Sequence, residues 1–463
     1  MATRTLLCLA GLASAMPAAA TEVQFEGFYR ARARGFSSLS IDAALDDAEP
    51  AKAWVQHRLY LAPRFIVSDK VAVFTEFRGL DGVTWGQAPT VERDSLQPFN
   101  VNGGGNNLPL AFTDDLRPPG SLTPSGLPGV VPDFSIWRVY GEVHGELGTF
   151  RFGRMPIHWG LGIWQNDGLG LNADYGDSAD RLQWERAFDD VFLRAAFEVD
   201  SQGLFSADDQ DAVAGNLAAS YRTERVEIGL NTQLRRYTGG GAEPLTVFTG
   251  SMAMDAEIGN LRVGAELVGR YGTGELGNLD SATIQSFGGL LVGELDAKPL
   301  KLGVDIGVAS GDGDSTDDTL GTFSFDRDYN IGILMFEQPM PVFTATDSGG
   351  RDLTQSLTGN GVSNAIFARA AASYDLPEDL TANVAVAAAR TFRRPEVLRD
   401  QTTYGLEVDA GLSYNATEHL ELSGTGAFFL PGSYYRNYTD GDTITDGYRG
   451  FVLGGQIMGR VSF

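Results

Sequence analysis

This chain of 463 residues contains a single cysteine, Cys8. Disulfide frameworks, thiolate metal sites and thiol nucleophiles are therefore excluded from the rest of the sequence. Lysine is also scarce, since only four of the 35 basic residues are lysines: Lys52, Lys70, Lys298 and Lys301. The other basic residues are arginines, the side chains best suited to fixed, partly buried positive charge.

Long apolar runs and an excess of positive charge are missing as well. After the first twenty residues no run of 18 apolar residues occurs, so the chain cannot cross a bilayer as a helix. The net charge of −25 offers no basic face to nucleic acid, and we expect no nucleic-acid partner. A hydrophobic content of 43% excludes a disordered chain. The 58 glycines, together with many Tyr, Phe and Val residues, favour β structure.

The first twenty residues have the pattern of an export signal. Arg4 supplies a positive start, residues 6–15 are apolar, and Ala18 to Ala20 form a small-residue cleavage site. An ordinary N-terminal helix or a membrane anchor is the alternative. We expect a signal peptide at 1–20 and one domain at 21–463.

The rest of the chain alternates apolar and polar residues in segment after segment. In the first segment Val23, Phe25 and Tyr29 share one face, whereas Glu26 and Arg30 share the other. Segments with the same alternation recur along the chain to its last residues. A period of two predicts β-strands with one apolar and one polar face.

Short and long connections alternate between these segments, and the longest connections are 81–133, 155–178 and 310–363. Nine long and eight short links join about 18 strands (16–18), with residues 328–338 placed inside the last of these loops. This asymmetry is typical of transmembrane β-barrels, with short periplasmic turns and long extracellular loops. Strands in lipid must pair every backbone group, so the sheet must close. The sequence predicts an all-β, closed antiparallel transmembrane barrel; a soluble sandwich or propeller is the alternative.

The polar face of the early strands is rich in arginine, and that of the later strands is acidic. Charges in a barrel interior must be hydrated or paired. We therefore expect a water-filled pore in which an arc of positive charge on the wall attracts anions. Arg30, Arg32 and Arg34 occupy alternate inward positions with no acid between them, which favours an exposed positive stripe. Salt-bridge ladders that brace the barrel are the alternative. The expected pore-lining, anion-binding residues are Arg30, Arg32, Arg34, Arg58, Arg64, Arg78, Arg138, Arg151 and Arg194.

Two loops carry further candidates. The loop at 155–178 contains Trp159, Trp164 and Asp167, and we expect it to fold inward as a constriction; stacking of its tryptophans on sugar rings is the alternative. The loop at 310–363 contains the spaced carboxylates Asp312, Asp314 and Asp317, which form a weak Ca²⁺ candidate. These carboxylates lack a distal Glu at the right place, so we expect a solvated acidic loop, no metal and no cofactor.

The end of the chain resembles the C-terminal signature of Gram-negative outer-membrane proteins. Ile457, Val461 and Phe463 share one face of a last strand, with Gln456 and Arg460 on the other. The resemblance implies a location in the outer membrane. It also implies contact with membrane lipids and lipopolysaccharide, and recognition of the strand ending at Phe463 by the barrel-assembly machinery.

The arginine-rich face, the Gly153-Arg154 pair at a strand end and the Ser-Gly-Asp sequence at 310–312 resemble porins of the alginate-export type. The resemblance implies an 18-stranded barrel that passes anionic polysaccharide through an arginine-rich pore. The later strands depart from that type because they are acidic. We therefore expect the porin role and do not carry over alginate as the substrate.

Together these patterns predict a porin for passive diffusion of hydrophilic, anionic, sugar- or polysaccharide-like solutes, without enzymatic activity. One alternative is an outer-membrane anchor or adhesin with an occluded lumen. The other is a barrel enzyme such as a lipid hydrolase. The four scattered histidines (His57, His144, His158 and His419) do not favour the enzyme, because no spacing joins two of them into a metal or catalytic site.

Overall fold

The computed structural model describes most of the chain and leaves the expected signal peptide and Asp314 outside the described residues. It describes residues 22–37, 51–86, 134–201, 212–237, 244–276, 279–312, 317–336, 361–394, 402–435, 437–439, 443–445 and 450–463.

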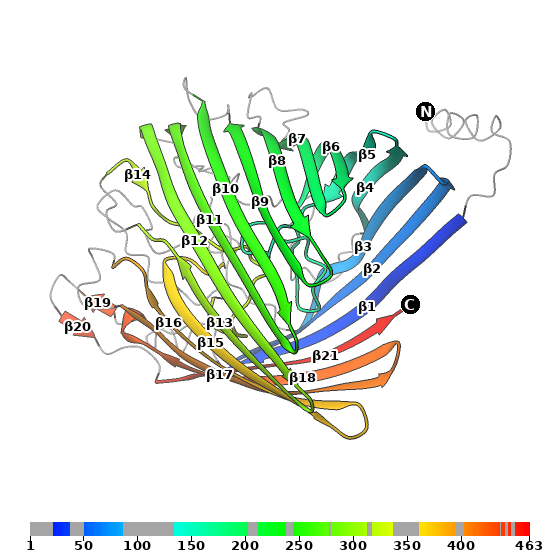
Figure 1. Cartoon of the computed structure of the whole chain (residues 1–463). Coiled ribbons are helices and arrows are strands. Elements are labelled where there is room, and N and C mark those ends of the chain that lie inside the picture. The colour runs from blue at the N-terminus through cyan, green and yellow to red at the C-terminus, as the bar shows by residue number, and fades with distance from the viewer. Residues whose placement is uncertain are drawn as a thin grey trace, which may run out of the picture.

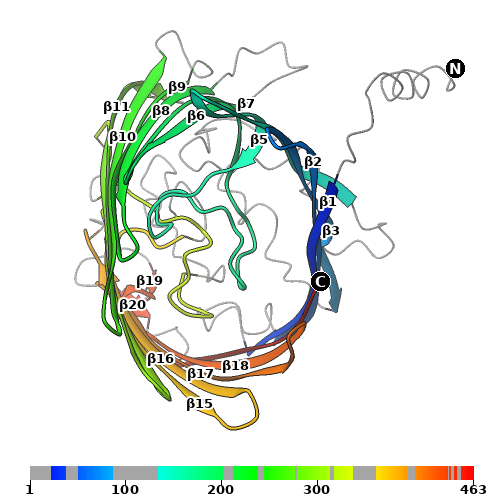
Figure 2. The same ribbon diagram turned by 45° about the vertical axis from the view of Figure 1, so that its right-hand side comes forward.

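Within these residues, eighteen antiparallel strands close into a barrel (Figures 1 and 2). The first strand, β1, pairs with both β2 and the last strand, β21, so Arg30 lies opposite both Arg58 and Arg460. This closure confirms the predicted fold class and strand number. The barrel strands are β1 (Glu22–Phe36), β2 (Lys52–Ser68), β3 (Val71–Gly86), β4 (Phe134–Gly145), β5 (Gly148–Pro156), β6 (Ser178–Phe188), β7 (Val191–Ser201), β8 (Ala212–Arg222), β9 (Val226–Tyr237), β10 (Leu245–Ile258), β11 (Leu261–Leu276), β12 (Leu279–Ala297), β13 (Leu300–Ala309), β15 (Ala365–Leu376), β16 (Leu380–Thr391), β17 (Thr403–Thr417), β18 (Leu420–Pro431) and β21 (Val452–Ser462).

Four short elements complete the described structure. Two-residue β14 (Thr319–Leu320) pairs in parallel with β12, and β19 (Asn437–Thr439) pairs with β20 (Thr443–Thr445). A 3₁₀ turn, η3, covers Ser433–Tyr435. Among the described residues, no helix has both the length and the apolar character needed to cross a membrane.

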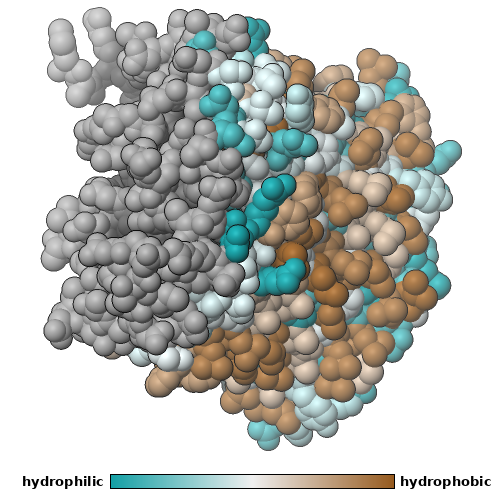
Figure 3. Space-filling view, turned by 90° about the vertical axis from the view of Figure 1, so that its left-hand side faces the viewer, coloured by the Kyte–Doolittle hydropathy of each residue, from teal (hydrophilic) through white to brown (hydrophobic). Residues whose placement is uncertain are grey.

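The alternation of the sequence sorts side chains between the two faces of the barrel wall. Large apolar side chains such as Phe25, Phe152 and Leu217 lie on the outer face and are 52%, 53% and 64% exposed. Figure 3 shows hydrophobic side chains over much of the outer face that it presents. The inner face carries buried charged side chains, including Arg32 and Glu266, each 0% exposed. An apolar outer belt around a polar interior is the arrangement of a barrel in lipid.

Connection lengths agree with the expected two rims, but one of the three longest loops begins later than expected. The loop expected at 81–133 begins only after Gly86, because β3 extends to that residue, with Asp81 still paired to His57 and Gly86 to Trp54 on β2. The expectation was wrong because pairing continues through a glycine-interrupted stretch whose alternation is weak. Residues 328–336 form no strand, as expected.

Candidate constriction in the barrel lumen

The connection between β5 and β6, residues 157–177, folds into the interior of the barrel (Figure 2). It is called loop A below. Backbone bonds hold its two arms together: the Trp159 N–H donates to the Gln165 carbonyl (3.1 Å) and the Asp177 N–H to that of Asn166 (2.6 Å). Gly160 has φ +57°, and a Cβ there would lie 2.8 Å from a Glu266 oxygen, so the tight approach to the wall requires glycine.

Glu266 on β11 holds the tip of loop A against one side of the barrel. Its carboxylate oxygen Oε2 accepts hydrogen bonds from the backbone N–H groups of Leu161 (2.8 Å) and Ile163 (3.3 Å). Beside it, the Trp159 indole donates to Ser251 Oγ at 3.0 Å. A fully buried carboxylate needs such partners, so Glu266 and the loop tip depend on each other.

The opposite side of loop A rests on the arginines of β1 and β2. Asp174 accepts a hydrogen bond from Arg30 (2.6 Å) and bonds from Arg32 to both oxygens, and Arg34 lies 3.7 Å away. Arg58 donates to the backbone carbonyls of Ala173 (3.0 Å) and Asp174 (2.5 Å). Loop A therefore crosses the lumen from the arginine side to the Glu266 side.

The exposed positive stripe expected at Arg30, Arg32 and Arg34 is wrong. The three side chains are 5%, 0% and 8% exposed, because loop A covers them and brings the carboxylate of Asp174 among them. Strand alternation identified the inward face correctly but said nothing about what packs on it. These arginines hold the loop by ion pairs and by hydrogen bonds to carbonyl oxygens.

Arg78 and Arg138 extend this contact along β3 and β4. Arg138 donates to the carbonyls of Asp167 (2.7 Å) and Asp177 (2.9 Å), and Arg78 to that of Tyr175 (2.8 Å). Both arginines also form ion pairs with Glu76, Arg138 at 2.8 Å and Arg78 at 3.3 Å. Glu76 thus offsets part of the positive charge of the two arginines, while other N–H groups of both guanidiniums donate to the backbone of loop A.

The remaining pore-lining candidates do not reach Asp174. Arg151 pairs with Glu142 (2.5 Å) and Glu185 (2.6 Å). Arg194 lies 5.8 Å from the ring centre of Trp159, and Arg64 lies 4.6 Å from that of Phe74.

The candidate constriction residues all lie inside the lumen. Trp159 and Trp164 are 7% and 4% exposed and pack in an apolar cluster, which does not favour sugar stacking on their faces. The backbone carbonyl of Asp167 accepts a hydrogen bond from Arg138. Its carboxylate accepts a hydrogen bond from the Leu169 N–H at 3.2 Å.

A second segment, residues 321–336, also enters the lumen and contacts loop A (Figure 2). It is called insert B below. The Asp328 carboxylate accepts the backbone N–H groups of Asp174 (2.7 Å) and Tyr175 (3.1 Å), and the Asp326 N–H donates to the Ile163 carbonyl (2.9 Å). On the wall, buried Glu407 accepts the N–H groups of residues 333–335 at 2.6–2.8 Å. The sequence identified this loop as long but not its docking.

An apolar cluster joins loop A, insert B and the wall. Phe325 packs edge-on against Phe323 and Phe367, at ring-centre distances of 6.0 Å and 5.9 Å. Buried members of the cluster include Ile163, Trp164, Phe323, Phe325, Leu334, Phe367, Tyr404 and Phe429. The two segments therefore form a packed body inside the barrel.

The Ca²⁺ candidate finds no support in the described part of loop 310–363. Asp312 accepts the Gly321 N–H (3.2 Å) and Asp317 the Thr319 N–H (2.8 Å), so both carboxylates serve local backbone groups. No three His, Cys, Asp or Glu side chains cluster as metal ligands among the described residues.

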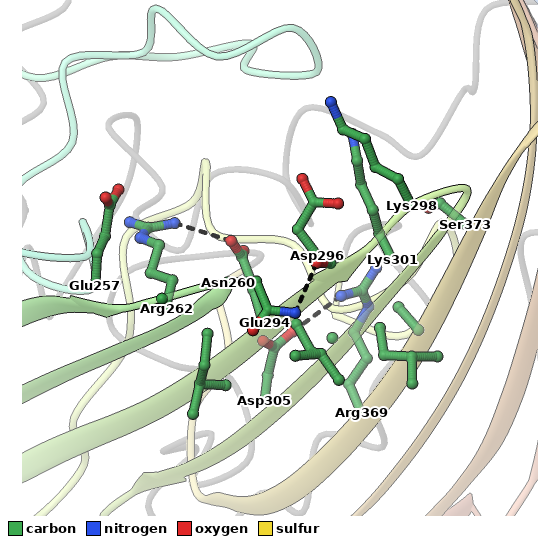
Figure 4. Close-up of a pocket in the computed structure, with 16 residues that line it drawn as sticks. Glu257, Asn260, Arg262, Glu294, Asp296, Lys298, Lys301, Asp305, Arg369 and Ser373 are labelled. Carbon is green, nitrogen blue, oxygen red and sulfur yellow. Dashed lines mark hydrogen bonds and ion pairs between the residues drawn. The ribbon is translucent and has the colours of Figure 1, made fainter.

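The inner wall also contains an open hollow of about 810 Å³ near the turns of β10–β11 and β12–β13 (Figure 4). Arg262 pairs there with Asp255 (2.5 Å) and Glu294 (3.2 Å), and Arg369 pairs with Asp305 (2.9 Å). The arginines of this hollow are thus matched by acids, in contrast to the arginine-rich wall of β1 and β2.

Acid should leave the bond between Asp174 and the arginines intact far below neutral pH. Burial alone would raise the pKa of Asp174, but Arg32, Arg30, Arg34 and Arg58 outweigh it and hold that pKa well below its usual range. In the unfolded chain an Asp has a pKa of about 3.9, so the contribution of the Asp174 carboxylate to stability is complete above about pH 5. This contribution is lost as the pH falls from the pKa of the unfolded state through the lower pKa of the folded state.

We therefore expect the difference in melting temperature between the protein and its D174N variant to stay constant from about pH 8 to pH 5, and to shrink below about pH 4. Circular dichroism melts in detergent measure it. The difference cancels the titration of groups that lie far from Asp174. A difference that vanishes between pH 7 and pH 5 would show that Asp174 is not held as a carboxylate.

No family model and no curated protein matches this chain. Solved structures share its fold. A BenF-like porin from Pseudomonas fluorescens Pf-5 is 11% identical, with 96% of this chain and 99% of that chain covered and a TM-score of 0.52. OccK9 (OpdG) from Pseudomonas aeruginosa is 12% identical, with coverages of 96% and 99% and a TM-score of 0.51. At this identity the likeness supports the barrel fold alone.

Proposed function

We propose that the chain is an outer-membrane channel for passive diffusion of hydrophilic, anionic, sugar-like solutes. The observation that carries the proposal is loop A, which is held across a charged lumen by Asp174 and Glu266 while the barrel presents an apolar face outward. An inward loop on a rigid wall sets the size and charge of the passage, which is how channels select solutes.

An outer-membrane location is part of the proposal. The apolar outer belt suits membrane lipids, with lipopolysaccharide on the side of the long loops. At the barrel closure the ring of Phe463 stacks on Phe25 on the outer face at 6.0 Å, within reach of an assembly machinery that would bind β21. A protein of the same fold is described as a porin, in support of the same role here.

The solute class follows from the charges of the lumen. Arginines concentrate on β1 to β4, while the arginines of the hollow at β10 to β13 and β15 are paired with acids. A positive arc on one side of a wet lumen lowers the entry barrier for anions. Alginate itself has no support beyond the sequence resemblance, and we do not propose it.

An occluded barrel that serves as an anchor or adhesin is the second candidate. It is favoured by one observation, the apolar cluster that fills part of the lumen between loop A, insert B and the wall. A barrel of this kind would pass no solute, whereas a constricted channel passes small ones.

Swelling of liposomes that contain the refolded protein separates the two candidates. We expect swelling in glucose and faster swelling in glucuronate of similar size, because the arginine-rich wall favours the anion. Protein-free liposomes provide the baseline. Absence of swelling with both solutes would contradict the channel and support the occluded barrel.

A further inference from the structure

We propose that Arg64 and Arg460, with the aromatic rings that they cover, form the anion-contact site of this channel. The inference rests on the proposed channel function and deepens it. It moves the contact with solute away from the arginine stripe of β1 and onto two stacks nearer the short-turn rim.

The stripe itself has little capacity left for a solute. Arg30 bonds Asp174 and the carbonyls of Leu171 (2.9 Å) and Ala173 (3.0 Å), and Arg32 bonds Asp174 and Gln56 (3.0 Å). A guanidinium has five N–H donors, and every bond named here except that of Arg32 to Gln56 goes to loop A. An anion would have to displace the loop to reach them.

Arg64 and Arg460 are held in a different way. The Arg64 guanidinium lies 4.6 Å from the ring centre of Phe74, which stacks on Tyr140 at 4.7 Å and 3°. The Arg460 guanidinium lies 4.3 Å from the ring centre of Phe28. Stacking on a ring fixes the plane of a guanidinium without using its N–H edges.

The second stack mirrors the first. Phe28 stacks on Tyr60 at 5.0 Å and 15°, so each arginine caps a pair of parallel rings. Across the described residues, no carboxylate forms an ion pair with Arg64 or Arg460. The strand register places Glu421 opposite Arg460 and Gln24 opposite Arg64, and neither closes onto its neighbour.

Both stacks lie on the inner wall, beyond loop A toward the short-turn rim. On β1, Gln24 and Phe28 precede Arg30, and the strand begins at that rim. Tyr60, Phe74 and Tyr140 share the inward parity of Arg58, Glu76 and Arg138 and are only partly buried.

The chemistry of the two stacks favours a carboxylate. Aromatic ring edges carry partial positive charge, and a planar guanidinium presents paired donors that match the two oxygens of a carboxylate. Two sources of solute share this chemistry: sugar acids, with a carboxylate on a hydroxylated ring, and aromatic acids, with a carboxylate on an aromatic ring. Glucuronate and benzoate, each compared with its uncharged analogue, distinguish the two sources.

The test is the reversal potential of single channels in a KCl gradient. We expect the double variant R64Q/R460Q to lower the chloride-to-potassium permeability ratio about fivefold. Loss of a charge about 4 Å from an ion in water changes its occupancy by that order. Lysines at both positions should keep most of the ratio, because they preserve charge, and lose the preference for glucuronate or benzoate over chloride.

Arg186 provides a matched control. Its guanidinium also covers a ring, that of Phe188 at 4.8 Å, but on the outer face of β6, so R186Q should leave the ratio unchanged. An anion-selective wild type whose ratio is unaffected by R64Q/R460Q would overturn this inference and leave the channel function standing. A wild type without conductance would overturn the channel function itself.

Discussion

Replacing Asp174 by Asn is expected to make the channel markedly more anion-selective and less stable. The substitution removes a carboxylate that lies among Arg30, Arg32 and Arg34, and so makes this part of the lumen more positive by one charge. Removal of one partner from a buried ionic cluster typically costs about 3 kcal/mol of folding free energy. We therefore expect a lower melting temperature together with a higher chloride-to-potassium permeability ratio.

Asp180 is the control for this change. It pairs with Arg154 at 2.6 Å and is 39% exposed, so D180N changes the net charge equally without releasing loop A. We expect a small shift in selectivity and a change in stability of about 1 kcal/mol or less. Equal effects of D174N and D180N would show that the Asp174 cluster does not hold the constriction.

Replacing Glu266 by Ala is expected to open the constriction from the opposite side. The change leaves the N–H groups of Leu161 and Ile163 without their acceptor on the wall, so the tip of loop A loses its anchor. We expect a higher and noisier single-channel conductance, with E266Q intermediate because its amide oxygen still accepts a hydrogen bond.

Glu257, an exposed acid on the inner wall of β10, supplies the comparison. E257A removes the same charge from the lumen without contact to loop A, and we expect its conductance and current noise to match those of the wild type. A conductance of E266A equal to that of E257A would contradict the anchoring role of Glu266.

The sequence predicted the barrel because its strands obey a local rule. In β8, from Ala212 to Arg222, buried and exposed residues alternate almost without exception, as a wall between lipid and a filled lumen requires. The same parity placed Arg30, Arg32 and Glu266 on the inner face. Strand number followed from the alternation of short and long links.

The interior could not be predicted in the same way. The bond between Arg30 and Asp174 joins residues 144 positions apart, and that between Asp174 and Asp328 spans 154. Parity tells which face a side chain occupies, but no local pattern tells which loop will reach it. The arginine stripe therefore had the signature of an exposed surface, although a loop covers it.

Arg460 shows the opposite case. Strand parity placed it inward, and the strand register places Glu421 directly opposite. Nothing in the sequence indicated that no carboxylate of the described residues would pair with it. Its stacking on Phe28 depends on side-chain geometry across the seam where the barrel closes. Such contacts between the first and last strands need the structure.

The most direct test of the central claim is the conductance of the refolded protein in a planar bilayer, with its reversal potential in a KCl gradient. We expect a stable open conductance with a preference for chloride. A barrel that carries no current, or one that prefers potassium, would contradict it.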